Sequence, residues 1–142
     1  MAQAAQRVFI VDDDESVCAS LRLLVESAGH RAVTFASAEE FLQSGFMKDA
    51  DCLILDIRMP GMGGFELQER LAGSEPRIPV IYITGHDRFG MEEKAMKLGA
   101  IAYLRKPFDE QLLLDAIQRA STHEVEKPID ARCICTTGGG KT

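Results

Sequence analysis

The residues of this chain that could do chemistry follow four short apolar segments. Three carboxylates come after the first segment, one after the second, a hydroxyl after the third and an ammonium after the fourth. In sequence order these are Asp12 to Asp14, then Asp56, then Thr84 beside Gly85, and then Lys106. If the segments are parallel strands of one sheet, their carboxyl ends meet at one edge, where open α/β sheets bind ligands. The spacing therefore predicts a cleft that combines carboxylate, hydroxyl and ammonium groups.

This mixture of groups suits phosphoryl transfer assisted by a divalent cation. Clustered carboxylates are unfavourable unless a positive group neutralises them. Mg²⁺ (or Mn²⁺) accepts carboxylate oxygens together with phosphate oxygens. A carboxylate can also attack a phosphoryl donor and form an acyl phosphate, a reaction that depends on positioning and charge stabilisation. Lys106 and the cation would neutralise the phosphoryl oxygens, Thr84 would donate a hydrogen bond to one of them, and Gly85 would leave room for the group.

The elements that must position these groups are strands alternating with helices. Apolar runs predict strands over 8–11, 31–35, 52–55, 80–83 and 101–104. Helical spacing predicts helices over about 17–28, 38–44, 65–71 and 88–98, and a fifth that Asp109 caps. Gly29 ends the first helix, and Ser37 with Glu40 forms a capping box at the second. Alternation of this kind predicts a parallel sheet with helices on both faces.

Length and composition exclude several classes of protein. The chain has 142 residues, which corresponds to one domain. We expect this domain to span residues 6–121, and residues 122–142 to be a disordered tail, a truncated linker or a cloning remnant. A net charge of −6 gives no electrostatic footprint for nucleic acid. No apolar run approaches the ~18 residues of a membrane helix.

The cysteines and the first residues predict a cytoplasmic protein. Residues 1–7 contain no apolar signal region, so export is not expected. Cys18 and Cys52 lie in apolar periodic segments and are predicted to be small core residues with reduced thiols. Cys133 and Cys135 fall in the predicted tail, without the partners that a metal site needs.

Five motifs in this order resemble a known family. They are Asp12-Asp13, Asp56 followed by Met59-Pro60 and Gly64, Thr84-Gly85, and Lys106-Pro107-Phe108. Together they resemble the receiver domain of bacterial two-component response regulators, over about residues 7–121. The runs 12–15, 83–86 and 93–99 look most like the FixJ-type subgroup of the CheY-like receivers.

The resemblance implies a flavodoxin-like (βα)5 fold with strand order 2-1-3-4-5. It implies that Asp56 accepts a phosphoryl group from a sensor histidine kinase or a phosphotransfer protein. It further implies that Asp13 and Asp56 bind Mg²⁺ directly, together with the main-chain carbonyl of Arg58, and that Asp12 holds the ion mostly through water. Lys106 would pair first with the acidic cluster and then with the phosphoryl group.

The resemblance also implies how such a protein signals. Thr84 would shift toward the phosphoryl group, and Tyr103 would be the switch aromatic that turns inward when it does. The face formed by helix 4, strand 5 and helix 5 would then bind a partner or a second copy, a local event that biases a bistable surface. The family has a cis bond where this chain has Lys106-Pro107. FixJ-type regulators carry a helix-turn-helix domain that nothing after Ser121 could form, so we expect a single-domain regulator or a fragment of a transcription regulator.

Each of these residues also has an ordinary structural interpretation. Asp12 to Asp14 could be a helix N-cap run, and Asp14 is expected to act mainly in that way. Asp56 could be a turn aspartate, and Thr84 a strand-end hydroxyl bonded to the backbone. Lys106 could be a surface lysine. Tyr103 could be a half-buried strand tyrosine.

Three other functions compete with the phosphorylated switch. A pseudo-receiver would act only as an interaction module, independently of phosphorylation. A haloacid-dehalogenase-type phosphohydrolase would need an acid two residues after its nucleophile, where this chain has Arg58. A flavodoxin-like flavin carrier would need a phosphate-binding loop in place of the three aspartates, which would repel an anionic phosphate without a metal. As a switch, the protein would catalyse only its own phosphorylation and dephosphorylation, with no direct role for nucleic acid or membrane.

Overall fold

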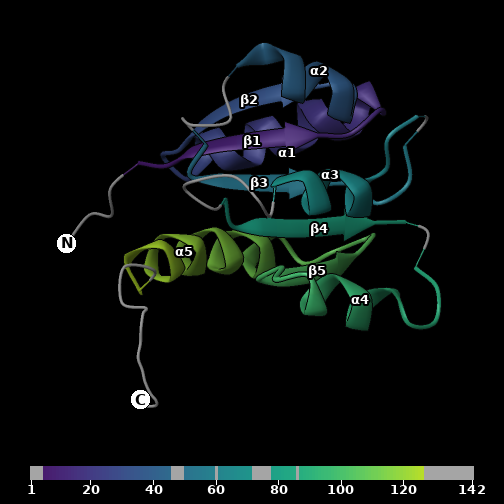
Figure 1. Ribbon diagram of the computed structural model, residues 1–142. Helices are drawn as coiled ribbons and strands as arrows, with labels where there is room; N and C mark the ends of the chain where they lie inside the picture. Colours follow the sequence, from purple (N-terminus) through teal and green to yellow (C-terminus); the bar gives the residue numbers. More distant parts are fainter. Residues whose placement is uncertain (1–4, 46–49, 60, 72–77, 86, 127–142) are drawn as a thin grey trace.

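A computed structural model describes residues 5–45, 50–59, 61–71, 78–85 and 87–126, and only the backbone for the last six of these. Five parallel strands form one sheet in the order β2-β1-β3-β4-β5 (Figure 1). The strands are β1 (Arg7–Val11), β2 (Arg31–Phe35), β3 (Cys52–Leu55), β4 (Val80–Thr84) and β5 (Ala102–Arg105). The predicted doubly wound fold and its strand order are therefore confirmed.

Five helices connect and cover the strands. They are α1 (Glu15–Ser27), α2 (Ala38–Ser44), α3 (Gly64–Leu71), α4 (Met91–Lys97) and α5 (Glu110–Glu126). Ser37 Oγ accepts a hydrogen bond from Glu40 N at 3.0 Å, and Glu40 Oε1 accepts one from Ala36 N at 2.9 Å. The first bond is the one that the predicted capping box requires, whereas the Glu40 side chain reaches back one residue further, to Ala36 N instead of Ser37 N. None of the described helices is long and apolar enough to cross a membrane.

Several predicted boundaries differ from the structure by one or more residues. The helix predicted over 88–98 is limited to α4, because Gly90 before it has a φ of +85°, a left-handed conformation that a helix cannot contain. The last strand begins at Ala102 rather than Ile101, within the usual uncertainty of strand ends. Helix α5 continues to Glu126, past the predicted end of the domain at Ser121, and residues 127–142 lie outside the described residues.

Two apolar layers hold the helices on the sheet. Alternate residues of a strand point to opposite faces, so Phe9 and Val11 pack on one side while Val8 and Ile10 pack on the other. The first layer contains residues of α2, α3 and α4, and the second contains residues of α1 and α5 (Figure 1). Cys18 and Cys52 are buried free thiols in the second layer, as predicted.

The register of the strands brings the predicted chemical groups together. Val11 pairs with Leu55, and Leu55 pairs with Tyr82. Because Asp12 and Asp56 directly follow two residues that pair, they leave the sheet side by side at its carboxyl edge.

Candidate functional site

Asp12 and Asp56 form the buried floor of the site. Asp12 N donates to Phe35 O at 3.1 Å, and Asp56 N donates to Val11 O at 3.1 Å. These bonds extend the strand ladders by one residue and fix both carboxylates at the sheet edge. Asp12 is 3% exposed and Asp56 is 6% exposed. Asp12 Oδ1 accepts from Asp14 N at 2.9 Å, and Asp56 Oδ1 accepts from Arg58 N at 3.3 Å.

The two neighbouring aspartates have different roles. Asp13 is exposed, and its carboxylate completes a group with Asp12 and Asp56 whose oxygens lie within 4.8 Å of one another. Asp14 is the N-cap of α1, because its Oδ1 accepts from Ser16 N at 2.9 Å and from Val17 N at 3.4 Å. The N-cap interpretation is thus confirmed for Asp14.

Lys106 directly follows β5, the last strand of the sheet, and brings a positive charge to the acidic group. Its Nζ lies 3.3 Å from Asp12 Oδ2 and 4.0 Å from Asp56 Oδ2. Its backbone N donates to Thr84 O at 2.8 Å, and the Lys106–Pro107 peptide bond is cis. The lysine side chain is 25% exposed, so the surface interpretation does not apply to Lys106.

The acidic pair carries more negative charge than its surroundings compensate. Burial raises the pKa of Asp12 above its usual value, against the opposing effects of the Asp14 N–H and Lys106. Burial, followed by the charge of Asp12, likewise raises the pKa of Asp56, although Lys106 opposes both. A further cation beside these groups would therefore be favourable.

The donor set fits Mg²⁺ or a similar hard cation. Three carboxylates within 4.8 Å of one another offer oxygen ligands, and one of them, Asp13, faces solvent, from which water molecules would supply further oxygen ligands to a bound ion. Burial, first of all, raises the pKa of Asp12 and Asp56, and a cation bound beside them would favour their ionised forms.

The loop after Asp56 is held tightly at its base and at its tip. Gly64 N donates to Ile57 O at 2.9 Å and closes the base of the loop. A Cβ on Gly64 would lie 2.7 Å from Asp56 O, which is too close, so glycine is required there. At the tip, Met62 N donates to Glu39 Oε2 at 3.0 Å. Arg58 lies between these fixed points and is exposed.

Thr84 and Gly85 lie at the end of β4, and Tyr103 lies in the neighbouring strand. Thr84 is fully buried. A Cβ on Gly85 would lie 3.6 Å from Lys106 Cδ, an ordinary contact, so the absence of a side chain leaves space rather than relieving a clash. Tyr103 is 7% exposed, and its ring packs 6.4 Å from that of Tyr82. The ring of Tyr103 is therefore buried rather than half-buried, and its role as a switch residue stays a prediction.

Several residues around the site were not predicted from the sequence. Asp87 accepts a hydrogen bond from the Tyr103 hydroxyl, and Glu39 holds the loop after Asp56. Gln68 accepts from the Tyr82 hydroxyl and donates from Nε2 to Leu98 O at 3.1 Å. Their side chains cross between elements distant in sequence, so helical or strand periodicity carries no signal for them.

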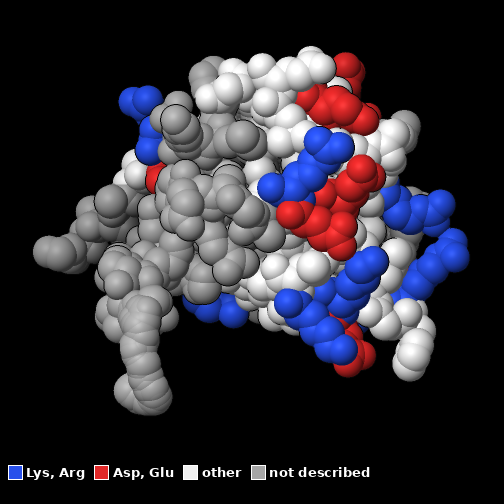
Figure 2. Space-filling model, in the orientation of Figure 1, with Lys and Arg blue, Asp and Glu red and all other residues white. Residues whose placement is uncertain are grey.

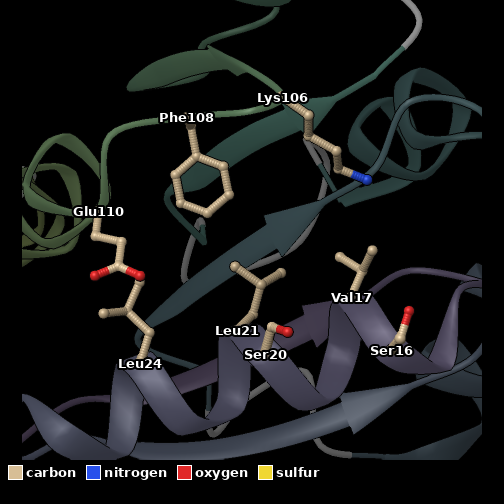
Figure 3. A pocket seen from close by; sticks show the side chains of 8 residues that line it. All are labelled: Ser16, Val17, Ser20, Leu21, Leu24, Lys106, Phe108 and Glu110. Carbon is tan, nitrogen blue, oxygen red and sulfur yellow. The ribbon is translucent and has the colours of Figure 1, made fainter.

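A shallow groove opens beside Lys106, and the surface charges are mixed. The groove has a volume of about 210 Å³ and separates α1 from the segment before α5. Figure 3 shows Val17, Leu21 and Leu24 on the α1 side and Phe108 opposite, with Lys106 at one end. On the face drawn in Figure 2, acidic and basic side chains are interspersed.

Comparisons with known proteins decide the family. A family profile described as the response regulator receiver domain matches residues 8–118. The chain belongs to the response regulator receiver family. Nodulation protein W of Bradyrhizobium diazoefficiens is 45% identical over 117 residues, which cover 82% of this chain and 52% of that protein. Response regulator protein TmoT of Ectopseudomonas mendocina is 46% identical over 113 residues, covering 80% of this chain and 51% of that protein.

Solved structures support the same assignment. The crystal structure of FixJ-N has a TM-score of 0.76 at 40% identity, covering 86% of this chain and 97% of that one. A receiver domain protein from Clostridium thermocellum has a TM-score of 0.78 at 30% identity, covering 84% of this chain and 97% of that one. The predicted resemblance to FixJ-type and CheY-like receivers is confirmed. Membership of this family argues against the phosphohydrolase and flavin-carrier alternatives. The chain spans about half the length of the curated relatives it matches.

Proposed function

We propose that this receiver domain is a phosphorylation-dependent switch that takes a phosphoryl group onto Asp56. The observation that carries the proposal is the position of Asp56 at the carboxyl edge of the sheet. There it is buried beside Asp12 and Asp13 and lies 4.0 Å from the ammonium of Lys106. The phosphodonor would be a sensor histidine kinase or a phosphotransfer protein, as expected for this family.

The proposed reaction is a transfer between a nitrogen and an oxygen. An Asp56 carboxylate oxygen forms a bond to phosphorus while the bond from phosphorus to the donor's imidazole nitrogen breaks, and the imidazole leaves with the electron pair. A bound Mg²⁺ would neutralise charge on the phosphoryl oxygens. Asp12, Asp13, Asp56 and the main-chain carbonyl of Arg58 would hold it.

Two other residues would bind the transferred group. Lys106 would exchange its contact with Asp56 for one with a phosphoryl oxygen, because the acyl phosphate carries the larger negative charge. Thr84 would donate its hydroxyl proton in a hydrogen bond to another phosphoryl oxygen, and Gly85 would leave space for the group. The protein would act as a catalyst only on itself, by taking up and then hydrolysing its own phosphoryl group.

The proposed output is a change in the α4–β5–α5 face. Thr84 and Tyr103 lie on neighbouring strands, and β4 pairs with β5 over four residues of each. A movement of Thr84 would therefore reach the packing of Tyr103 and α4. We propose that this face then binds a second copy or controls an output partner in transcription regulation. We also propose a cytoplasmic location, where the buried thiols of Cys18 and Cys52 stay reduced.

The alternative is a pseudo-receiver that binds partners without phosphorylation. Intact-protein mass spectrometry after incubation with acetyl phosphate and Mg²⁺ separates the two. We expect the wild type to gain one phosphoryl group, and expect no gain without the metal or with Asp56→Asn. Asp115→Asn, an exposed change of the same type on α5, is the matched control and should be modified like the wild type.

Rapid hydrolysis of the acyl phosphate could hide the adduct, so beryllofluoride provides a second measurement. Beryllofluoride imitates a phosphoryl group and is not turned over. We expect a Mg²⁺-dependent change in the NMR spectrum of the wild type but not of Asp56→Asn. Absence of both the adduct and this change would refute the switch in favour of the pseudo-receiver.

A further inference from the structure

A cluster of charged side chains joins the loop after β4 to β5 and α4. Asp87 Oδ1 accepts a hydrogen bond from the Tyr103 hydroxyl at 2.6 Å, and Asp87 Oδ2 accepts one from Arg105 Nε at 2.7 Å. The second side of the Arg105 guanidinium donates to Glu92 Oε1 at 2.6 Å. The same guanidinium lies over the Tyr103 ring, 5.3 Å from its centre. Asp87 thus holds two residues of β5 at once.

The contact with Asp87 selects one position of the Tyr103 ring. The ring is 7% exposed and belongs to the apolar layer that includes Tyr82 and Ala95 of α4. In this inward position the hydroxyl reaches the carboxylate of Asp87, and hydrogen bonds to an ionised acceptor are roughly twice as strong as neutral ones. A ring turned out of this layer would lose both the apolar packing and the carboxylate.

Both partners keep the protonation states that the bond requires. The Tyr103 hydroxyl and the Arg105 guanidinium lower the pKa of Asp87, so its carboxylate stays charged at neutral pH. Burial and the adjacent carboxylate raise the pKa of Tyr103, so its hydroxyl keeps the proton that it donates. Arg105 supports the same geometry, since it fixes the second oxygen of Asp87.

We propose that Asp87 is a positioning residue that holds Tyr103 inward before a phosphoryl group arrives, and so sets the resting balance of the switch. The inference rests on the proposed function, because it assigns a regulator to Tyr103. If the inward ring and the phosphoryl group favour the same state, each strengthens the other by the same factor. Asp87 would therefore raise the affinity of the domain for a phosphoryl analogue from outside the acidic site.

Fluorine NMR can follow Tyr103 directly. The chain has two tyrosines and no tryptophan, so labelling with 3-fluorotyrosine gives two resonances, and Tyr103→Phe assigns them. Asp87→Ala removes the carboxylate. Glu93→Ala is the matched control, because it breaks an exposed ion pair on α4, with Lys97 at 3.5 Å, without touching Tyr103. Far-UV circular dichroism verifies that each variant is folded, and Asp87→Asn, which keeps an acceptor oxygen, provides a milder second variant.

The expected result is a Tyr103 resonance that becomes sensitive to solvent exchange between H₂O and D₂O in Asp87→Ala, to a smaller degree in Asp87→Asn, and not in Glu93→Ala. Titration with beryllofluoride and Mg²⁺ should show affinity weakened by about three- to tenfold in Asp87→Ala, the size expected from losing one such hydrogen bond. A Tyr103 resonance equally protected in Asp87→Ala and the wild type would overturn the inference, and so would an unchanged beryllofluoride affinity.

The proposed function and the role of Asp87 can be refuted separately. If the wild type itself gives neither a phosphoryl adduct with acetyl phosphate nor a Mg²⁺-dependent response to beryllofluoride, the proposed function is wrong. The solvent sensitivity of Tyr103 without beryllofluoride still decides whether Asp87 holds the ring inward. If the wild type responds and Asp87→Ala responds identically, the switch stands and the role of Asp87 is refuted.

Discussion

Replacing Asp56 with asparagine should stabilise the metal-free protein, although it removes the residue on which the proposed function depends. The carboxylate of Asp56 is buried beside two others, and burial raises its pKa. Asparagine has nearly the same shape and keeps an oxygen that can accept from Arg58 N, as Asp56 Oδ1 does at 3.3 Å. The substitution therefore removes mainly a buried charge.

The size of the effect follows from the distances. At an effective dielectric constant of about 20, two like charges no more than 4.8 Å apart repel by about 3.5 kcal/mol or more. Lys106 at 4.0 Å attracts Asp56 by about 4 kcal/mol on the same scale. The repulsion from Asp12 and this attraction nearly cancel, which leaves the desolvation of Asp56 and a solvent-screened repulsion from Asp13. We expect a net stabilisation of roughly 1–2 kcal/mol in Asp56→Asn.

The pH dependence gives the sign of this effect a separate test. Because the pKa of Asp56 is raised in the folded protein, the folded state binds more protons than the unfolded state between the usual and the raised pKa. The stability of the wild type thus falls as pH rises through this window and is lowest above it. The advantage of Asp56→Asn should be complete at pH 7 and should disappear as pH falls toward 3.8, the usual pKa of aspartate.

Thermal and urea unfolding in EDTA, followed by circular dichroism at pH 7 and pH 4, measures both quantities. The midpoint of thermal unfolding should rise by roughly 3–8 °C at pH 7. Asp115→Asn is the control for a generic change of aspartate to asparagine. Added Mg²⁺ at ten times its dissociation constant should stabilise the wild type by about 1.4 kcal/mol and Asp56→Asn by less. Destabilisation by Asp56→Asn at pH 7, or an equal advantage at pH 4, would refute the reasoning.

Three further substitutions test the surroundings of the acidic group. Lys106→Ala should destabilise the metal-free protein by about 1–2 kcal/mol in urea unfolding, and Mg²⁺ should recover more stability in this variant than in the wild type; an equal recovery would contradict the charge argument. Gly64→Ala should destabilise the protein by about 1–3 kcal/mol, because its Cβ would lie 2.7 Å from Asp56 O. Phosphorylation of this variant, measured by intact-protein mass spectrometry, should also be slower than that of the wild type. Gln68→Ala should destabilise by about 1–2 kcal/mol through the lost bond to Leu98 O, whereas unchanged urea unfolding would show that this bond contributes nothing.

The sheet and the acidic group could be predicted from the sequence because both depend on local patterns. Apolar runs of strand length fix the strands, and in a parallel sheet the residue after each run must lie at the same edge. That rule places Lys106 at the same edge as Asp12, 94 positions earlier, and the structure has their contact at 3.3 Å. The family resemblance then supplied the strand order, which the runs by themselves do not determine.

The side-chain contacts of Asp87 could not be predicted in this way. Asp87 lies in a loop, and its two bonds reach residues of β5 that follow it by 16 and 18 positions. An apolar pattern does not specify a side-chain hydrogen bond between a loop and a strand that are so far apart in the sequence. The resemblance implied that Tyr103 turns inward when Thr84 shifts, whereas here its ring is already buried and its hydroxyl donates to Asp87.

The acidic group is held in place by the fold rather than by its own interactions. Main-chain bonds that extend the strands, from Asp12 N to Phe35 O and from Asp56 N to Val11 O, position carboxylates whose charges repel. The apolar layers on both faces of the sheet supply the stability that allows this unfavourable arrangement. The site is therefore rigid and incompletely neutralised before any ligand arrives. A bound cation would add the positive charge that such a site lacks, and little of its binding energy would be needed to assemble the site.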